Sequence, residues 1–209
     1  MLDLSQFRLV DLSVMLHPGR EQRRLEIRRG VIPSDGTIMH EVDLMSHLGT
    51  HVEAMSHFYE SGKDITELPL ERFVGRAVVL RLDHVAAGAE VTGADLARAA
   101  EGLNVEGSIV LLTSPHRADR APKLTAEAAQ WLADRHITMM GIDDRVGLGA
   151  NADVTRAVHD VLMSREVPFL EVLSGLDQLQ RREFLLIALP LKIAGLDSSP
   201  VRAVALEPL

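Results

Sequence analysis

Three histidines, at positions 47, 51 and 57, lie within eleven residues of this chain, and the carboxylate of Glu53 lies among them. Imidazole and carboxylate groups are ligands of catalytic zinc and manganese sites, which leave a position open for water. All four positions are odd, and alternate side chains of an extended strand point to the same face. The spacing therefore predicts a strand that gathers His47, His51, Glu53 and His57 on one side, as a metal site would require.

A helix is the alternative conformation for this segment, and it fits less well. On a helix that advances about 100° per residue, His47 and His51 share a face while Glu53 points away from them. Gly49 and its β-branched neighbours also favour a strand over a helix interior. On a strand, Gly49 leaves an empty place where a metal or substrate can approach the backbone. His57 either completes the ligand shell or acts as an acid or base near neutral pH. Ordinary hydrogen-bonded histidines remain the simpler alternative, which four convergent groups make less favoured.

A second pair, His159 and Glu171, has two interpretations. A predicted helix from about Val154 to Arg165 places His159 among apolar residues, and Glu171 lies between apolar neighbours in the next predicted strand. An ionised carboxylate in such a strand is costly unless it is paired or bound to a cation. In the other interpretation both side chains lie on solvated faces. The residue pattern alone favours neither the site interpretation nor the solvated one.

The elements that must position these groups alternate between strands and helices along the whole chain. Thr92 and Thr125 are suited to cap helices, and Pro168 must follow the end of the third helix. The predicted strands cover residues 7–13, 37–53, 73–82, 108–113, 137–142, 169–173, 184–189 and 201–206, and the predicted helices cover 94–100, 125–133 and 154–165. Strands interleaved with about three helices predict a mixed α/β domain, whose sheet order the pattern does not give.

An arginine-dense stretch from Arg20 to Arg29 is expected to form an exposed arm or loop. Two roles are open for it. Arg20, Arg24 or Arg28 could reach an acidic substrate or a neighbouring subunit. The alternative is a solvated arm whose charge is balanced by nearby glutamates, and this interpretation is favoured.

Composition limits the remaining possibilities. The chain has 209 residues, with 22 Lys and Arg against 30 Asp and Glu, and the resulting charge of −8 argues against a nucleic-acid partner. Hydrophobic residues make up 46%, enough for one packed domain over residues 1–209, and zero Cys restricts a metal to His and carboxylate ligands. No apolar stretch is long enough for a membrane span, and Met1 to Leu4 lacks the pattern of a signal peptide. We therefore expect a cytoplasmic protein.

The segment H-L-G-T-H-V-E-A-M-S-H at 47–57 resembles the signature H-x-G-T-H-x-D-x-P-x-H of the metal-dependent cyclase family, which includes kynurenine formamidases and isatin hydrolases. The resemblance extends over nearly the whole chain. Its further segments are V-D-L-S at 10–13, S-I-V-L-L-T at 108–113, L-T-A-E-A-A-Q-W-L at 124–132, G-I-D at 141–143, H-D-V-L at 159–162, P-F-L-E-V-L at 168–173, A-L-P-L-K-I at 188–193 and S-P-V-R-A at 199–203.

The resemblance implies a swivelling β/β/α fold, a homodimer or homotetramer, and one or two divalent ions such as zinc or manganese. By motif position, His47 and His51 would bind the first ion, and Glu53 stands where the family has a bridging Asp. His159 would bind a second ion, and Glu171 would complete or bridge the pair. The spacing between His159 and Glu171 matches the family, which favours the site interpretation of that pair.

The resemblance gives His57 the role of proton donor and acceptor in the hydrolysis of a small-molecule amide, with an N-formyl, aryl or cyclic amide as substrate. A bound ion would lower the pKa of its water and polarise the carbonyl. Thr50, Ser56 or Asp43 is expected to support the ligands. Lactone or cyclic-imide hydrolysis, ring closure on the same groups, and a metal- or ligand-binding protein without turnover stay open as alternatives.

Three departures from the family pattern bear on these alternatives. Glu53 adds a methylene to the family's Asp, which changes its bridging geometry. Met55 replaces the signature Pro and would place a flexible thioether near the pocket. The stretch from Leu16 to Arg20 stands where kynurenine formamidases carry a Pro- and Trp-containing segment.

Overall fold

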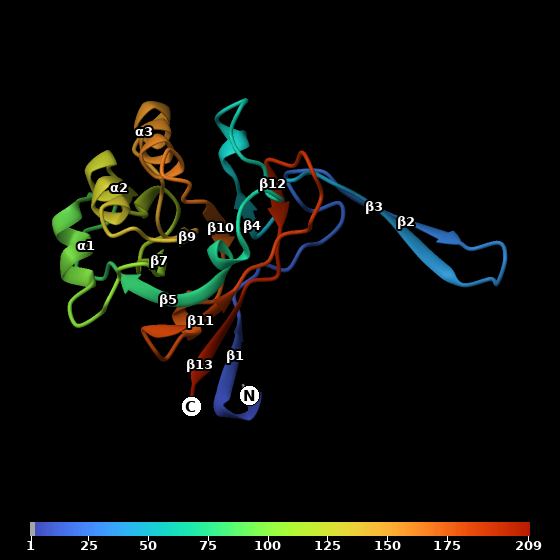
Figure 1. The fold of residues 1–209 in the computed structure, drawn as a ribbon, viewed down its shortest axis with the longest axis horizontal. Coiled ribbons are helices and arrows are strands. Elements are labelled where there is room, and N and C mark those ends of the chain that lie inside the picture. The colour runs from blue at the N-terminus through green and yellow to red at the C-terminus, as the bar shows by residue number, and fades with distance from the viewer. Residues whose placement is uncertain (1–2) are drawn as a thin grey trace.

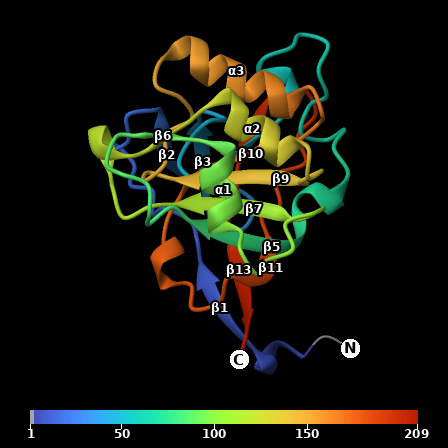
Figure 2. The same ribbon diagram turned by 90° about the vertical axis from the view of Figure 1, so that its left-hand side faces the viewer.

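The structure, a computed structural model, describes residues 3–209 as a curled mixed sheet of nine strands with three α-helices on one face (Figures 1 and 2). The strands of this sheet are β1 (Phe7–Asp11), β4 (His51–Glu53), β5 (Val74–Arg81), β7 (Ile109–Thr113), β9 (Met139–Asp143), β10 (Phe169–Leu173), β11 (Glu183–Ile187), β12 (Ser198–Pro200) and β13 (Val204–Pro208). The α-helices are α1 (Gly93–Ala99), α2 (Ala126–Ala133) and α3 (Ala152–Met163).

Smaller elements complete the chain. Two two-stranded sheets pair β2 (Leu25–Val31) with β3 (Ile38–Leu44), and β6 (Glu90–Val91) with β8 (Lys123–Leu124). Short 3₁₀ turns are η1 (Leu4–Gln6), η2 (Met55–His57), η3 (Leu70–Arg72), η4 (Ala118–Arg120) and η5 (Leu176–Gln178). The expectation about a signal peptide concerned Met1 to Leu4. Of these residues, Met1 and Leu2 lie outside the described part of the chain. No helix within 3–209 is long and apolar enough to cross a membrane.

The nine-stranded sheet runs in the order β1-β13-β11-β5-β7-β9-β10-β4-β12. Its central strands β5, β7, β9 and β10 are parallel, and each helix connects two of them in turn: α1 joins β5 to β7, α2 joins β7 to β9, and α3 joins β9 to β10. Every residue of β7 and β9 is buried, as expected for parallel strands covered on both faces. The mixed α/β prediction is confirmed, and α3 lies beside the strand that carries Glu171.

The helices begin where the sequence provides side-chain caps. The hydroxyl of Thr92 accepts a hydrogen bond from the Asp95 amide, and Asp95 reciprocates in a capping box. The hydroxyl of Thr125 accepts the Ala128 amide in the same way at α2. The side chain of Asn151 caps α3. All three predicted helices are therefore present, with ends shifted by one or two residues.

The predicted strand over residues 37–53 is confirmed at its two ends, as β3 and β4, and is wrong between them. The chain is extended over β3 and β4 but turns between Leu44 and His51, so His47 lies in a turn rather than on a strand. Gly49 has a φ of +60°, a left-handed conformation that a β-branched residue would resist. A Cβ there would also lie only 2.7 Å from the Leu16 side chain. Gly49 thus makes the turn, and Leu16 fills the place that we expected to be empty.

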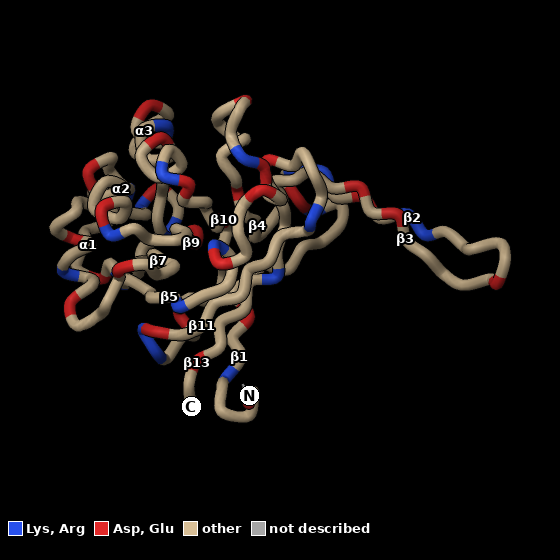
Figure 3. The backbone as a smooth tube through the Cα atoms, viewed as in Figure 1, with Lys and Arg blue, Asp and Glu red and all other residues tan. Residues whose placement is uncertain are grey.

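The arginine-dense stretch continues into a β-hairpin that projects from the body of the molecule (Figures 1 and 3). An exposed arm was the expectation, and this part of it is confirmed. The strand at residues 25–31 was not predicted. Its register with β3 runs from Leu25 opposite Leu44 to Val31 opposite Ile38. Strand β12 at the sheet edge was also not predicted.

Candidate metal centre

Strand β4 lies between β10 and β12 and carries two of the predicted ligands into the interior. In the antiparallel register of β4 and β10, His51 is directly opposite Glu171 and Glu53 is directly opposite Phe169. Directly opposed residues share a face, and so do residues two apart on one strand. His51, Glu53 and Glu171 therefore converge, and one ligand atom from each lies within 4.8 Å of the other two.

His47 joins this group from the turn before β4. Its Nδ1 lies 2.7 Å from Oε1 of Glu53, and its Nε2 lies 2.7 Å from Oδ2 of Asp197, just before β12. The same Oδ2 lies 3.0 Å from Nδ1 of His57 in η2. Asp197 thus holds two of the histidines at once, and ligand atoms of His47, Glu53 and His57 lie within 4.8 Å of one another.

His159 reaches the group from the inner face of α3. Its Nε2 lies 3.8 Å from Oε2 of Glu53 and 3.8 Å from Oε1 of Glu171. The ring stacks on Phe169, with centroids 4.4 Å apart and planes inclined by 20°, and Phe58 packs at 4.5 Å. Since Phe169 is opposite Glu53 in the sheet, this stacking places the imidazole over the carboxylate.

The imidazoles of His51 and His159 are oriented by backbone carbonyls. Nδ1 of His51 donates to the carbonyl of Gly49 at 2.7 Å, and Nδ1 of His159 donates to the carbonyl of Thr155 at 2.8 Å. In the neutral tautomer this leaves each Nε2 with a lone pair directed toward carboxylates. Oε2 of Glu53 is buried and accepts no hydrogen bond from the described residues. A proton or a metal ion must lie between such groups.

The pKa shifts of His159, His47 and Glu53 agree with this geometry. Burial opposes a positive charge on His159, but Glu171 and Glu53 outweigh it and raise the pKa of His159 to about 9. Burial likewise opposes charge on His47, and hydrogen bonds to Glu53 and Asp197 raise its pKa nevertheless. The surrounding imidazoles hold the pKa of Glu53 well below its usual range despite the burial of that carboxyl. The site therefore favours positive charge in its centre.

The donor set also fits a metal ion. Two ligand atoms about 2.1 Å from one tetrahedral ion lie about 3.4 Å apart. Oε1 of Glu53 lies 3.3 Å from Nε2 of His51, and the two contacts of His159 at 3.8 Å are too long for hydrogen bonds but near this spacing. Nitrogen and oxygen donors without sulfur suit zinc or manganese.

A strained backbone positions Glu171. Val172 has a φ of +57°, unusual for a β-branched residue, where the pairing of β10 with β9 is irregular. The buried hydroxyl of Thr50 donates to the carbonyl of Val172 at 2.7 Å and accepts the amide of Val14 at 3.0 Å. Thr50 thus clamps the irregularity that turns Glu171 toward the site and Val172 toward solvent.

A cavity of about 500 Å³ opens over His47, His51 and Glu171. Its other walls include the apolar Val14 and the cationic Arg20 and Arg23, which belong to the segment leading into the hairpin. The guanidinium of Arg23 donates to the carbonyl of His47. The cavity is therefore polar at its base, with arginines at its rim.

The structure brings together all six residues predicted for the site, namely His47, His51, Glu53, His57, His159 and Glu171. Of the expected supporting residues, Thr50 supports the site through Val172, Ser56 Oγ has no hydrogen-bond partner among the described residues, and Asp43 instead pairs with Arg24 on the hairpin. Met55 packs in the hydrophobic core rather than near the cavity, so that expectation is wrong. Asp197 was missed, although it lies between the resembling segments 188–193 and 199–203.

The chain is similar to one family model and to several known hydrolases. The Cyclase family model matches residues 10–145. A kynurenine formamidase of Bordetella petrii is 29% identical over 204 residues, covering 95% of this chain and 94% of that protein. One from Bacillus cytotoxicus is 31% identical and covers 78% of each chain. The structure of isatin hydrolase A from Labrenzia aggregata is 27% identical, with a TM-score of 0.78, covering 98% of this chain and 95% of that one.

Proposed function

This chain belongs to the Cyclase family, and on that premise we propose that it is a metal-dependent hydrolase that cleaves the C–N bond of a small-molecule amide. The names of two relatives, kynurenine formamidase and isatin hydrolase A, denote hydrolases. We propose an N-formyl, aryl or cyclic amide as the substrate class. The cavity over the histidines, about 500 Å³, has room for a molecule of this size.

Five side chains would hold one or two divalent ions, zinc or manganese. His47, His51 and Glu53 would form the first set, and His159, Glu171 and Glu53 would form the second. The observation that carries this proposal is the buried Oε2 of Glu53, which has no hydrogen-bond partner among residues 3–209 and faces the Nε2 of His159. A bound divalent ion supplies a water of lowered pKa and polarises the substrate carbonyl.

His57 would transfer the proton to the leaving nitrogen. Asp197 fixes its Nδ1, and the ring is partly open to solvent, with 32% of the side chain exposed. An ionised Asp197 accepts the Nδ1 proton, which leaves Nε2 as the nitrogen that can take up and release a proton. Proton transfer of this kind contributes roughly a hundredfold or more to amide cleavage.

Arg20 would select for an anionic group on the substrate. It lines the cavity that also contains His47 and His51, whereas Arg24 pairs with Asp43 and Arg28 pairs with Glu41 on the hairpin. Arg20→Ala should therefore raise the KM for an amide that carries a carboxylate. Arg28→Ala is the matched control. An unchanged KM for Arg20→Ala would remove Arg20 from the proposal.

The test of the proposed function combines metal content with turnover. His51→Ala should lose both bound metal and hydrolysis of a panel of amides, while His57→Ala should keep the metal and lose turnover. His136→Ala, which changes an exposed histidine, is the control. Full hydrolysis by chelated, metal-free protein would contradict the proposal. Hydrolysis of lactones or cyclic imides alone would favour the alternative substrates, and stoichiometric metal without any hydrolysis would favour a binding protein.

A further inference from the structure

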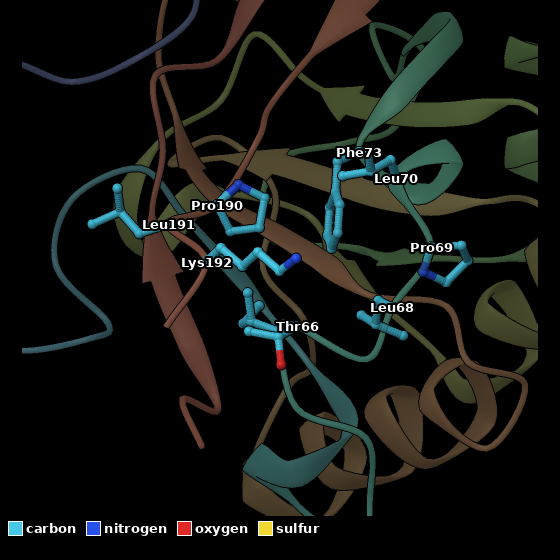
Figure 4. A pocket seen from close by; sticks show the side chains of 9 residues that line it. Thr66, Leu68, Pro69, Leu70, Phe73, Pro190, Leu191 and Lys192 are labelled. Carbon is cyan, nitrogen blue, oxygen red and sulfur yellow. The ribbon is translucent and has the colours of Figure 1, made fainter. Parts of the chain in front are cut away.

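An apolar groove of about 300 Å³ lies outside the metal cavity (Figure 4). Seven of the nine residues that line it are apolar. One wall comes from residues 65–73, which include the turn η3, and the other wall comes from residues 190–192 before β12. None of the nine residues lines the cavity over the histidines. The groove is therefore a separate hollow with a lining of its own.

The floor and walls of the groove are held by the fold. Leu68 and Phe73 are 5% and 1% exposed and belong to the hydrophobic core. The amide of Ala188 donates to the carbonyl of Phe73 at 2.9 Å, which joins the start of the second wall to the first. The amide of Leu191 donates to Oγ of the buried Ser199 in β12 at 3.0 Å. The groove is thus formed before any ligand binds, as most small-molecule sites are.

Lys192 carries the one charge in the groove lining. Its side chain extends from its own wall toward the opposite wall (Figure 4). Within residues 3–209 its ammonium forms no salt bridge, whereas Lys63 pairs with Glu166 at 2.6 Å. The hydroxyl of Thr66, the other polar residue of the lining, donates to Asp64 at 2.7 Å. The groove therefore presents one uncompensated positive charge beside an apolar surface.

We propose that this groove is a second ligand site, which binds a small apolar carboxylate. The apolar body of the ligand lies between the two walls, and its carboxylate pairs with the ammonium of Lys192. Burial of the apolar body supplies most of the affinity, and the ion pair fixes the orientation. A volume of about 300 Å³ is that of about ten water molecules in the liquid, which suits an acid with one phenyl ring and a short chain.

Exposure and charge both favour this occupant. Leu70 and Leu191 at the groove are 66% and 56% exposed, so a ligand would cover apolar surface that the chain itself leaves open. The lining contains no acidic residue. At physiological salt, charges more than about 8 Å away are largely screened, so a single carboxylate would be affected chiefly by Lys192. An anionic membrane would instead meet the acidic surface of a chain with a net charge of −8.

Calorimetric titration of the full-length protein tests the ion pair. The probes are 4-phenylbutanoate and its uncharged amide. The wild type should bind the acid with a Kd of about a millimolar or below, and the amide about three- to fivefold more weakly, because an ion pair with an exposed lysine contributes little. Lys192→Gln should bind both probes equally. Lys63→Gln, a lysine outside the groove, should keep the preference for the acid.

Two outcomes of this titration would overturn the proposal. One is a wild type that does not bind the acid in the millimolar range, and the other is an unchanged preference for the acid in Lys192→Gln. A wild type that fails to bind the acid but co-sediments with phosphatidylserine vesicles would assign the groove to a lipid surface instead.

A second pair of variants tests the apolar contact. Leu191→Ser changes an exposed residue of the lining and should weaken the acid and the amide alike, by about threefold or more. Leu189→Ser is the matched control, because Leu189 is 46% exposed on the same segment but does not line the groove. Equal weakening by the two variants would contradict binding in the groove.

The groove must also be distinguished from the metal cavity, since carboxylates bind divalent ions and Arg20 lines that cavity. Chelated, metal-free protein and Arg20→Ala should both bind 4-phenylbutanoate as tightly as the wild type does. Loss of binding in either would place the acid at the metal centre and overturn the proposal. These titrations measure binding without turnover, so their outcome is independent of the proposed hydrolase activity.

Discussion

The metal centre and the β2–β3 hairpin are held in place in opposite ways. The centre joins residues far apart in the chain: His47 contacts Asp197, 150 positions away, and His51 and Glu53 are buried. The hairpin joins near neighbours through strand register, and most of its side chains are exposed. The same chemical change should therefore have large effects in the centre and small effects in the hairpin.

Changing a glutamate to glutamine in each region should give the largest contrast. Glu53→Gln puts an amide where imidazole nitrogens face a buried carboxylate, and it should lower metal affinity and turnover by more than about a hundredfold, beyond the range for outer residues. Glu41→Gln, on the exposed hairpin, should leave both unchanged. Metal analysis and kcat/KM measure the two effects. Comparable losses in both variants would remove the contrast between the regions.

Asp197→Asn should have the next largest effect. Asp197 does not belong to either proposed ligand set but orients both His47 and His57, and burial of this carboxyl is outweighed by those contacts, which lower its pKa. The variant should retain its metal and lose about ten- to a hundredfold in kcat. Asp43→Asn on the hairpin is the control. Loss of metal from Asp197→Asn would instead make Asp197 a ligand.

Thr50→Val should destabilise the fold through the strained backbone beside Glu171. The buried hydroxyl pairs with the carbonyl of Val172 and the amide of Val14, and its removal leaves both groups unsatisfied. We expect a loss of about 2 kcal/mol in the free energy of unfolding, measured with urea. Thr50→Ser should restore most of it. Thr37→Val at the exposed hairpin tip should cost less than about 0.5 kcal/mol. A Thr50→Val variant as stable as the wild type would show that the clamp is dispensable.

The identities of the site residues could be predicted from the sequence, but their geometry could not. Spacing and the family resemblance gave the six residues, yet His47 and His57 do not lie on the strand of His51 and Glu53. The turn depends on Gly49 packing against Leu16, a contact between segments that no local pattern records. Asp197 was missed for the same reason, since its partners lie 140 and 150 positions away.

Strand β2 of the hairpin was not predicted, although its pattern is local. Its register is local, and Leu25, Ile27, Arg29 and Val31 alternate with residues of the polar face, but the density of arginines indicated a solvated arm instead. Fold class and all three helices were predictable because caps and apolar periodicity are short-range signals. The order of the nine strands was not predictable, because pairing between distant strands leaves no trace in a single sequence.

Arg28→Ala on the exposed hairpin should have the smallest effect. Arg28 contacts Glu41 at 3.3 Å and Glu26 at 3.6 Å, with 61% of its side chain exposed. Exposed pairs contribute less than about 1 kcal/mol, so the free energy of unfolding should change by no more than about 0.5 kcal/mol. Unfolding in urea measures the change. A loss as large as that expected for Thr50→Val would show that this ion pair, rather than strand register, stabilises the hairpin, and it would remove the contrast with the buried centre.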